Sequence, residues 1–307
     1  MSMDAIQKQL FEQIADLHEV PQGAYNFRVN GEGTGRNTTE NINIITKSDK
    51  PGIDIIIKAG TKKESVHIPV VISQTGLQEC VYNDFYVGED ADVTIVAGCG
   101  IHNPGDKTSE HDGIHTFHLA KNAHVRYVEK HYGTGEGTGE RILNPETVVF
   151  LDEGSTLEMD TVQIEGVDST VRKTRATVGD KASLVIREKI MTHDRQFAKT
   201  DFSVEMNGED SSVDLVSRSV AKDNSRQEFL SEIVGNNRCK GHSECDAILM
   251  DHGAVAAAPK LTANHLDASL IHEAAIGKIA GDQIIKLMTL GLTEEEAEQQ
   301  IISGFLK

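Results

Sequence analysis

The chain has 307 residues, of which 38% are hydrophobic and none is tryptophan, which favours an elongated body of one large or two modest domains. Its formal net charge of −18 would repel phosphate backbones, so nucleic-acid binding is not expected. No apolar run approaches the roughly 18 residues of a membrane span, and no signal-peptide pattern is present, so we expect a soluble cytoplasmic protein without a membrane partner.

The N-terminal segment, residues 1–75, is expected to differ from the rest of the chain. Residues 4–18 have the pattern of an acidic amphipathic helix. Residues 28–73 contain short apolar stretches interrupted by glycine and proline, which indicates irregular strands.

The middle of the chain, residues 76–275, is internally repetitive. Each copy has a polar, turn-forming start, a small residue and then alternating apolar positions, and copies begin about 26 to 32 residues apart. Six copies are clear and a seventh, at 235–243, is degenerate: 88–96, 120–128, 152–160, 178–186, 208–216 and 264–272. Period-two alternation predicts strands with one buried face, and stacking of equivalent strands predicts a β-solenoid. An antiparallel sandwich is the structural alternative.

Histidines and glycines are concentrated between residues 102 and 143. The Gly-rich segment 131–143 lacks the GK[ST] ending of a phosphate loop, so it is interpreted as a mobile solenoid loop. The concentration of histidines resembles a metal store, and whether the region 102–131 binds metal stays open. We favour surface positions for the six histidines, because a strand would place the side chains of His115 and His118 on opposite faces. The six are His102, His111, His115, His118, His124 and His131. Arg126, Glu129 and Lys130 either line a channel or pair across coils, and pairing is the favoured expectation.

The four cysteines, Cys80, Cys99, Cys239 and Cys245, show no CxxC spacing and do not suggest a disulfide framework. Cys80 and Cys99 stand beside apolar stretches and are expected to be buried structural residues.

A metal site is predicted near the end of the repeats. Cys245 and Glu273 are 28 residues apart, close to one repeat, so they are expected on neighbouring coils at nearly the same angular position. With His272 they would offer thiolate, carboxylate and imidazole ligands within several ångströms, a set that suits iron. The alternative is a buried cysteine and a solvated Glu–His pair without a joint role.

The C-terminal segment, residues 276–307, is predicted to be a helical hairpin that closes the solenoid. Apolar residues Ile284, Ile285, Leu287 and Met288 share one face of a helix over 281–290, and Gly291 suits its left-handed end. Thr293 and Glu296 form a capping box for a second helix, with Ala297, Ile301 and Ile302 turned inward. The hairpin is either an end cap for the solenoid or a docking surface.

Four stretches together resemble the SufB/SufD family of the SUF iron–sulfur cluster assembly system. They are "HVRYVEKHYG" (124–133), "ECDAIL" (244–249), "HEAAIGKI" (272–279) and "DQIIKLMTLGLTEEEAEQQIISGF" (282–305). The resemblance spans roughly residues 88–307 and implies a right-handed parallel β-helix flanked by helical segments. It also implies that the C-terminal helices dock the ABC-type ATPase SufC, which would supply ATP hydrolysis that this chain does not perform.

The resemblance assigns roles to the same three residues that the spacing selected. Cys245 matches the cysteine that SufB proteins use to hold nascent sulfur and cluster, Glu273 matches a carboxylate implicated as a ligand, and His272 matches a histidine that SufD-type members contribute across the subunit interface. The implied function is a SufB-like scaffold for a transient iron–sulfur cluster, in a homodimer or a SufD-like heterodimer. Sulfur would come from a donor, and the cluster would pass to acceptor apo-proteins.

Two alternatives remain open. A SufD-like structural partner would shape the complex without holding the cluster. The chain is shorter than long bacterial SufB proteins and resembles the compact members of the family, which leaves its pairing undecided. A polysaccharide lyase or hydrolase on a parallel β-helix is disfavoured, because only 5% of residues are aromatic and the chain lacks a sugar platform.

Overall fold

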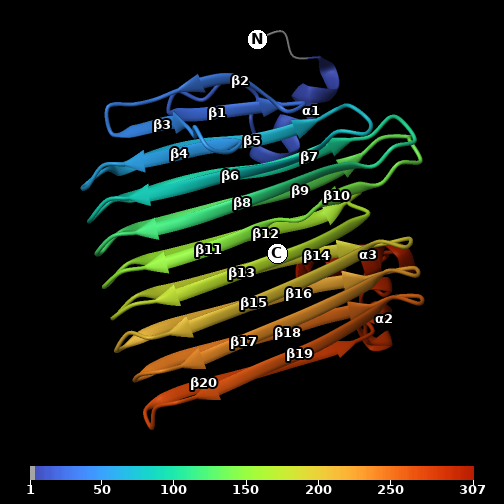
Figure 1. Cartoon of the computed structure of the whole chain (residues 1–307). Helices are drawn as coiled ribbons and strands as arrows, with labels where there is room; N and C mark the ends of the chain where they lie inside the picture. The colour runs from blue at the N-terminus through green and yellow to red at the C-terminus, as the bar shows by residue number, and fades with distance from the viewer. Residues whose placement is uncertain (1–3) are drawn as a thin grey trace.

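Strands make up 59% of the chain, and the computed structural model, which describes residues 4–307, arranges them as a β-solenoid of about 8 turns (Figure 1). Residues 1–3 of the predicted N-terminal segment lie outside the described part. Most coils contribute one strand to each of two ten-stranded sheets. The predicted mainly β solenoid with flanking helices is therefore confirmed. The antiparallel sandwich is excluded, since every pairing between coils is parallel.

Sheet 1 contains the repeated segments found in the sequence, including the degenerate one, which forms the first part of β18. Its strands, in chain order, are β1 Ala24–Val29, β2 Glu32–Asn37, β5 Lys62–Ile72, β7 Asp92–His102, β9 His124–Thr134, β12 Thr156–Glu165, β14 Ser183–Thr192, β16 Ser211–Ala221, β18 Cys239–Leu249 and β20 Ala268–Gly277.

Sheet 2 faces sheet 1 across the core. Its strands are β3 Ile42–Thr46, β4 Gly52–Ile57, β6 Gln78–Val87, β8 Ser109–Leu119, β10 Arg141–Leu143, β11 Glu146–Leu151, β13 Ser169–Val178, β15 Phe197–Met206, β17 Arg226–Gly235 and β19 Ala254–Ala263. Parallel stacking begins before residue 75, since β4 pairs with β6 and β5 with β7, while β1–β2 and β3–β4 are antiparallel.

The turns explain the polar start of each repeat. A residue with positive φ stands one or two positions before a sheet 1 strand in successive coils: Asp90, Asn122, Gly154, Lys181 and Asp210. Asp and Asn tolerate this left-handed conformation better than most residues, and glycine adopts it without strain. The backbone N–H of each of these residues donates to a carbonyl of the next coil, as from Asp90 to Lys121 O at 3.0 Å. The turns therefore stack with the same regularity as the strands.

The core lies between the inner faces of the two sheets. Alternate residues of the stacked strands point inward, and the largest fully buried side chains include Tyr127, Phe85, Phe117 and Phe202. Phe85 and Phe117 occupy equivalent positions on β6 and β8, and their rings stack with centroids 4.5 Å apart. Stacking of like residues on successive coils thus fills the core as well as the turns.

The N-terminal helix α1, Ala5–Ala15, lies on the outer face of sheet 1 (Figure 1). Gly98 and Gly100 of β7 point outward beneath it, and a Cβ atom at Gly98 would come within 2.7 Å of the Ile14 carbonyl. These glycines allow the helix to approach the sheet closely. The prediction of a helix in this segment is confirmed.

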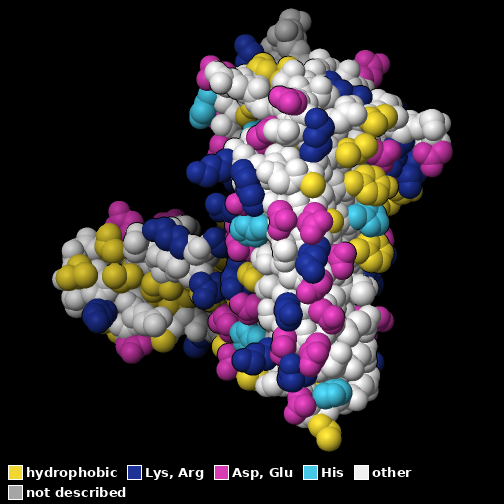
Figure 2. Space-filling model, turned by 90° about the vertical axis from the view of Figure 1, so that its left-hand side faces the viewer, with side chains coloured by type: hydrophobic (Ala, Val, Ile, Leu, Met, Phe, Trp, Pro, Cys, Tyr) yellow, Lys and Arg dark blue, Asp and Glu magenta, His cyan; other side chains and the backbone are white. Residues whose placement is uncertain are grey.

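The C-terminal helices α2, Gly281–Met288, and α3, Glu294–Phe305, form the predicted hairpin. Gly291 between them has a φ of +97°, and Thr293 and Glu296 form the predicted capping box. The placement expected from the sequence was wrong: the hairpin does not close the end of the solenoid. It projects from the side of the column (Figure 2), because Ile302 of α3 packs on Val220, an outward-facing apolar residue of β16.

Within residues 4–307, no helix combines the length and the apolar character needed to cross a membrane.

Candidate functional site at the C-terminal coils

The spacing of Cys245 and Glu273 predicted neighbouring coils correctly but not the direction of the side chains. β18 and β20 pair in parallel with Cys245 opposite Ala274 and with Glu244 opposite Glu273, so Cys245 and Glu273 are one register position apart. Because successive residues of a strand point to opposite faces, an offset of one position places the two side chains on opposite faces of the sheet. Cys245 points into the core and is 1% exposed, whereas the Glu273 side chain is 67% exposed on the outer face. The structure does not bring these two side chains together.

His272 lies on the same side of sheet 1 as Cys245. It stands opposite Ser243 in the register, and its Nδ1 lies 3.2 Å from the Ser243 carbonyl oxygen. Nδ1 donates to this carbonyl, since a carbonyl can only accept, and Nε2 of the neutral ring is then available as a ligand. His272 is half-buried at the last coil, two register positions from Cys245. Of the predicted residues, the thiol and the imidazole therefore share a face, and the carboxylate does not.

Glu273 has different neighbours on the outer face. His242, Glu244 and Glu273 each offer a ligand atom, and these three atoms all lie within 4.8 Å of one another. His242 Nε2 lies 3.5 Å from Glu273 Oε2. We call these three residues the outer triad. Sequence reasoning missed His242 and Glu244, although counting alternate positions along β18 from an inward Cys245 would have placed both outside.

Asp214 orients the outer triad. His242 Nδ1 lies 2.8 Å from Asp214 Oδ1, and this hydrogen bond raises the pKa of His242 above its ordinary value. Asp214 is held in turn by Arg187 of the preceding coil. A histidine that donates one ring nitrogen to a carboxylate presents the other as a ligand in a fixed orientation, which is the usual second-sphere arrangement of metal sites. Burial and Asp246 raise the pKa of Glu244.

Cys245 lies at the end of a buried polar row. The row consists of residues at equivalent register positions of β9, β12, β14, β16 and β18, namely Glu129, Thr161, Glu188, Ser217 and Cys245. Ser217 Oγ donates to Glu188 Oε2 at 2.7 Å, and Arg172 of β13 lies between Glu188 and Glu129, 2.6 Å from the latter. Burial raises the pKa of the Cys245 thiol to about 12, and Glu188 and Asp246 contribute. In this conformation the thiol is protonated at neutral pH.

The expectation of surface positions was wrong for three of the six histidines. His111, His115 and His131 are buried in the solenoid, because each occupies an inward position of β8 or β9. His115 has internal partners at both ring nitrogens, since Nδ1 lies 2.8 Å from Tyr127 Oη and Nε2 lies 3.2 Å from Asn83 Nδ2. Burial lowers the pKa of His115 to about 4, which keeps the ring neutral. His118 points outward and stacks between Tyr86 and Phe150, so the prediction that His115 and His118 occupy opposite faces is confirmed.

The expected pairing of Arg126, Glu129 and Lys130 across coils is confirmed for the first two. Arg126 reaches Asp160 at 3.3 Å, and Glu129 forms its buried pair with Arg172. Lys130 instead pairs with Asp16 beyond the end of α1 at 2.7 Å. The cysteines are all free thiols; Cys99 is buried, as expected, whereas Cys80 is only half-buried.

The Gly-rich loop stacks on its neighbour. The backbone N–H groups of Gly137 and Gly139 donate to the carbonyls of Asn103 and Gly105, so they are not directed at a phosphate. A Cβ at Gly137 would lie 2.2 Å from the Gly105 oxygen, which explains the glycine there. The interpretation as a solenoid loop in place of a phosphate loop is supported.

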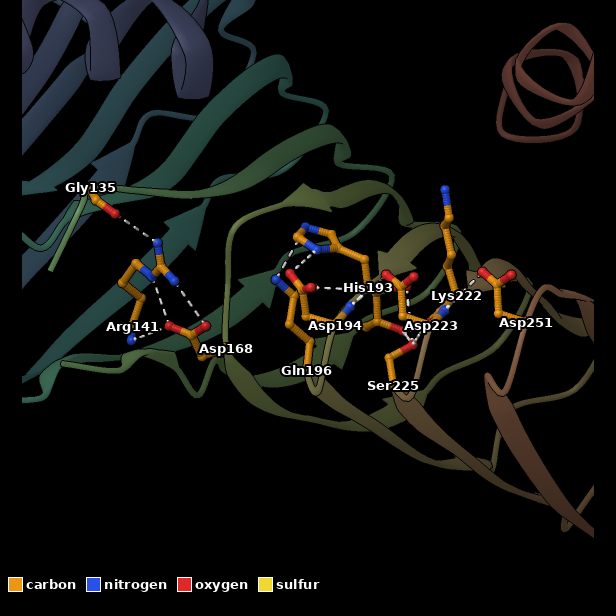
Figure 3. A network of polar contacts seen from close by, with 11 residues as sticks. Gly135, Arg141, Asp168, His193, Asp194, Gln196, Lys222, Asp223, Ser225 and Asp251 are labelled. Carbon is orange, nitrogen blue, oxygen red and sulfur yellow. Dashed lines mark hydrogen bonds and ion pairs between the residues drawn. The ribbon is translucent and has the colours of Figure 1, made fainter. Parts of the chain in front are cut away.

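A second group of possible ligands, His193, Asp194 and Asp223, lies on the turns beside this loop (Figure 3). These groups have structural partners. Asp223 Oδ2 accepts from the Asp194 backbone N–H at 2.9 Å, and Asp251 Oδ2 accepts from that of Asp223 at 3.4 Å. The aspartates therefore link successive turns, and we assign them no ligand.

The C-terminal coils of the parallel β-solenoid carry thiol, imidazole and carboxylate groups, which are side chains of the types that bind metal ions. The profile of the family described as "SUF system FeS cluster assembly, SufBD core domain" matches residues 74–305. The chain belongs to this SufBD family, as its resemblance to SufB and SufD predicted.

Three archaeal relatives illustrate the similarity, each described as an iron-sulfur cluster assembly SufBD family protein. That of Methanocaldococcus jannaschii is 27% identical over 255 residues, covering 82% of this chain and 79% of the relative. That of Archaeoglobus fulgidus is 29% identical over 229 residues, covering 74% and 60%. That of Methanothermobacter thermautotrophicus is 28% identical over 241 residues, covering 76% and 57%. The chain thus spans less than two thirds of the last two relatives.

Proposed function

We propose that this chain is a SufB-like scaffold on which a transient iron–sulfur cluster is assembled, with Cys245, Glu273 and His272 as its ligands. Membership of the SufBD family supports a role in iron–sulfur cluster assembly. One observation supports the scaffold role. The outer triad lies on one face of β18 and β20, and Cys245 and His272 lie on the other face, one or two register positions away from it.

The two faces have complementary chemistry. Carboxylate and imidazole groups of the outer triad suit Fe²⁺, and the Cys245 thiolate suits sulfide or persulfide and iron together. A joint site requires that β20 shift, because the sheet separates Glu273 from Cys245. β20 is the last strand of sheet 1 in the described chain, so only its pairing with β18 holds it in that sheet. A movement of this edge strand would also expose the Cys245 thiol and let it ionise.

Exposed apolar residues of the chain provide surfaces for the proposed partners. Three large apolar side chains of the hairpin are exposed, namely Ile285 (63%), Met288 (42%) and Leu290 (77%). We assign them as the docking surface for the SufC-type ATPase, which supplies ATP hydrolysis. Ile271 and Ile276 of β20 are exposed as well, and we assign this edge to a second chain, identical or SufD-like. A sulfur donor and acceptor apo-proteins complete the system, which we place in the cytoplasm. The chain itself is an assembly component and not an enzyme.

A SufD-like role without a cluster is the second candidate. It is favoured by the burial of Cys245 and by the elevated pKa of its thiol, which together leave no thiolate ready for iron in the closed solenoid. Under this alternative, the outer triad and Cys245 would have structural roles only.

Anaerobic reconstitution with ferrous iron and sulfide separates the two candidates. Iron and acid-labile sulfide retained after desalting are measured for the wild type, for Cys245→Ala and for Cys239→Ala, which removes a second buried thiol of the same strand. The scaffold role predicts a cluster on the wild type and on Cys239→Ala but not on Cys245→Ala. Iron and sulfide at background level in all three proteins would support the SufD-like role, whereas a cluster retained equally by all three would show that Cys245 is not its anchor.

A further inference from the structure

A small cavity lies inside the solenoid, far along the chain from Cys245. It is enclosed by β5, β7, β8, β9, β10 and the connection between β10 and β11, and its volume is about 20 Å³. The polar groups that line it belong to Cys99, His111, His115, Glu129 and His131. A cavity of this size holds one water molecule or one ion.

His111 has one ring nitrogen available as a metal ligand on the side of the cavity. Its side chain is 6% exposed, and its Nδ1 lies 3.1 Å from Glu79 Oε1. Arg28 fixes the same carboxylate at 2.8 Å. Nδ1 therefore donates to Glu79, and the lone pair of Nε2 has no hydrogen-bond partner among the described residues. Gly113 keeps the space before this nitrogen open, since a Cβ there would stand only 3.4 Å from His111 Nε2.

Cys99 and His131 supply further donors from sheet 1. They are opposite each other in the register of β7 and β9, and both point inward. Gln163 follows His131 at the equivalent position of β12, and its buried Nε2 has no partner within residues 4–307. Buried polar groups are almost always satisfied in folded proteins, so this orphaned N–H donor requires an acceptor, for which a water molecule is the simplest candidate.

We propose that the cavity binds one divalent transition-metal ion of the Zn²⁺ class through Cys99 Sγ, His111 Nε2 and His131. One thiolate and two imidazoles select Zn²⁺ or Co²⁺ over Mg²⁺ and Ca²⁺, and a water molecule completes the tetrahedron. His115 is not assigned as a ligand, because Asn83 and Tyr127 engage its two ring nitrogens at 3.2 and 2.8 Å. The two ring nitrogens of His131 have longer contacts, with Arg172 at 3.5 Å and Glu129 at 3.6 Å.

Binding requires small adjustments. The donor atoms are not yet all within 4.8 Å of one another, so side-chain rotation must draw them around the ion. Arg172, now 3.5 Å from His131 Nδ1, must release that nitrogen and remain with Glu129. The Cys99 thiol loses its proton to solvent as the sulfur–metal bond forms. The site is independent of the proposed function, because β9, β12, β14 and β16 separate Cys99 from Cys245.

The experiment uses Co²⁺, whose thiolate-to-metal charge-transfer absorption reports a sulfur ligand. The full chain is produced in minimal medium supplemented with Co²⁺, treated with EDTA to remove surface metal, and analysed for metal content and absorption. We expect about one cobalt per chain with charge-transfer absorption in the wild type. Cys99→Ser should lose the absorption, and His111→Gln should lose most of the metal. Cys239→Ser and Cys245→Ser should keep both signals.

Circular dichroism and thermal unfolding of each variant in EDTA check the fold. If Cys99→Ser does not fold, the wild type and Cys245→Ser still decide the question. A wild type without stoichiometric cobalt or without charge-transfer absorption overturns the proposal, since water then occupies the cavity. Absorption that disappears in Cys245→Ser overturns it too, because the ion would then sit at the C-terminal coils. Loss of cluster assembly in Cys245→Ala with retention of the cobalt signal would separate the two sites.

Discussion

Cys245 and Glu273 are one register position apart on adjacent strands, and their side chains leave the sheet in opposite directions. Any cluster that uses both must therefore form after β20 has moved relative to β18, or between two chains. Until then, the outer triad and the Cys245 thiol should respond to substitution and to pH as two separate sites.

The outer triad should bind Fe²⁺ without the help of Cys245. Asp214→Asn should weaken anaerobic Fe²⁺ binding about 10- to 100-fold, because it removes the carboxylate that orients His242. Glu232→Gln, an exposed carboxylate of sheet 2 paired with Lys260, serves as the matched control and should leave binding unchanged. Isothermal titration calorimetry measures both. Equal Fe²⁺ affinity of the two variants would show that Fe²⁺ does not bind at the outer triad.

Binding at the outer triad should depend on pH through His242. Asp214 raises the pKa of His242 above 6.5, and only the neutral ring can ligate a metal. Affinity should therefore fall as the pH drops through this raised pKa, which is at a higher pH than for an ordinary histidine. In Asp214→Asn the fall should begin at lower pH. The same Fe²⁺ titrations, repeated across pH, test this shift.

The Cys245 thiol should make the folded state less stable in alkali. Its pKa is about 12 in the folded chain and lower when unfolded, so the unfolded state loses the proton first as the pH rises. Its contribution is intact below the unfolded pKa and declines by about 1.4 kcal/mol per pH unit above about pH 9. Urea unfolding of the wild type and Cys245→Ala at several pH values should show this difference in slope. Parallel slopes would indicate a thiol that solvent reaches in the folded state.

Arg172 should be essential for stability because it lies between two buried carboxylates. Arg172→Met should cost about 3–5 kcal/mol, since Glu129 and Glu188 would lose their shared cation. Although burial acts against it, Arg172 holds the pKa of Glu129 well below its usual range. Arg175→Met on the same strand removes a half-exposed pair with Asp201 and should cost under about 1 kcal/mol. Similar losses in urea unfolding of both variants would contradict the buried-pair account.

The hairpin offers a test of partner docking. Met288→Asp places a charge in the exposed apolar face of α2 and should weaken binding to the SufC-type ATPase at least tenfold, because docking would bury an unpaired carboxylate. No residue of α2 is buried in the isolated chain, so its thermal midpoint should not change. Gln283→Asp adds the same charge on the opposite side of the helix and is the control. Equal affinities of Met288→Asp and Gln283→Asp for the ATPase in surface plasmon resonance would show that docking uses another surface.

The repeats predicted much of this fold because every coil starts with the same turn. Asp90, Asn122 and Asp210 mark those turns in the sequence, and the strands after them form sheet 1. The strands of sheet 2 went unassigned, since several of their inward positions carry polar residues such as Thr174 and Thr200. The aspartates of their turns, Asp194, Asp223 and Asp251, were not recognised as a shared feature. The hairpin was found but misplaced, because only packing on Val220 reveals which surface it covers.

The candidate site was predicted in its residues but not in its geometry. A 28-residue interval identifies neighbouring coils, yet coil lengths vary by a few residues, and an error of one reverses the face on which Glu273 lies. The buried histidines were missed for a related reason: imidazoles are usually exposed, and the partners that satisfy His111 and His115 come from β6 and β9. Such pairings depend on the register between strands.

The most direct test of the scaffold role is cluster formation in the assembled complex. The full chain, the SufC-type ATPase and ATP are incubated anaerobically with ferrous iron and sulfide, and Mössbauer spectra are recorded for complexes with wild type and with Cys245→Ala. The account predicts cluster iron with sulfur coordination in the wild-type complex and its loss in Cys245→Ala. The same cluster in both complexes would show that Cys245 is not its anchor and would contradict the scaffold role proposed for these coils.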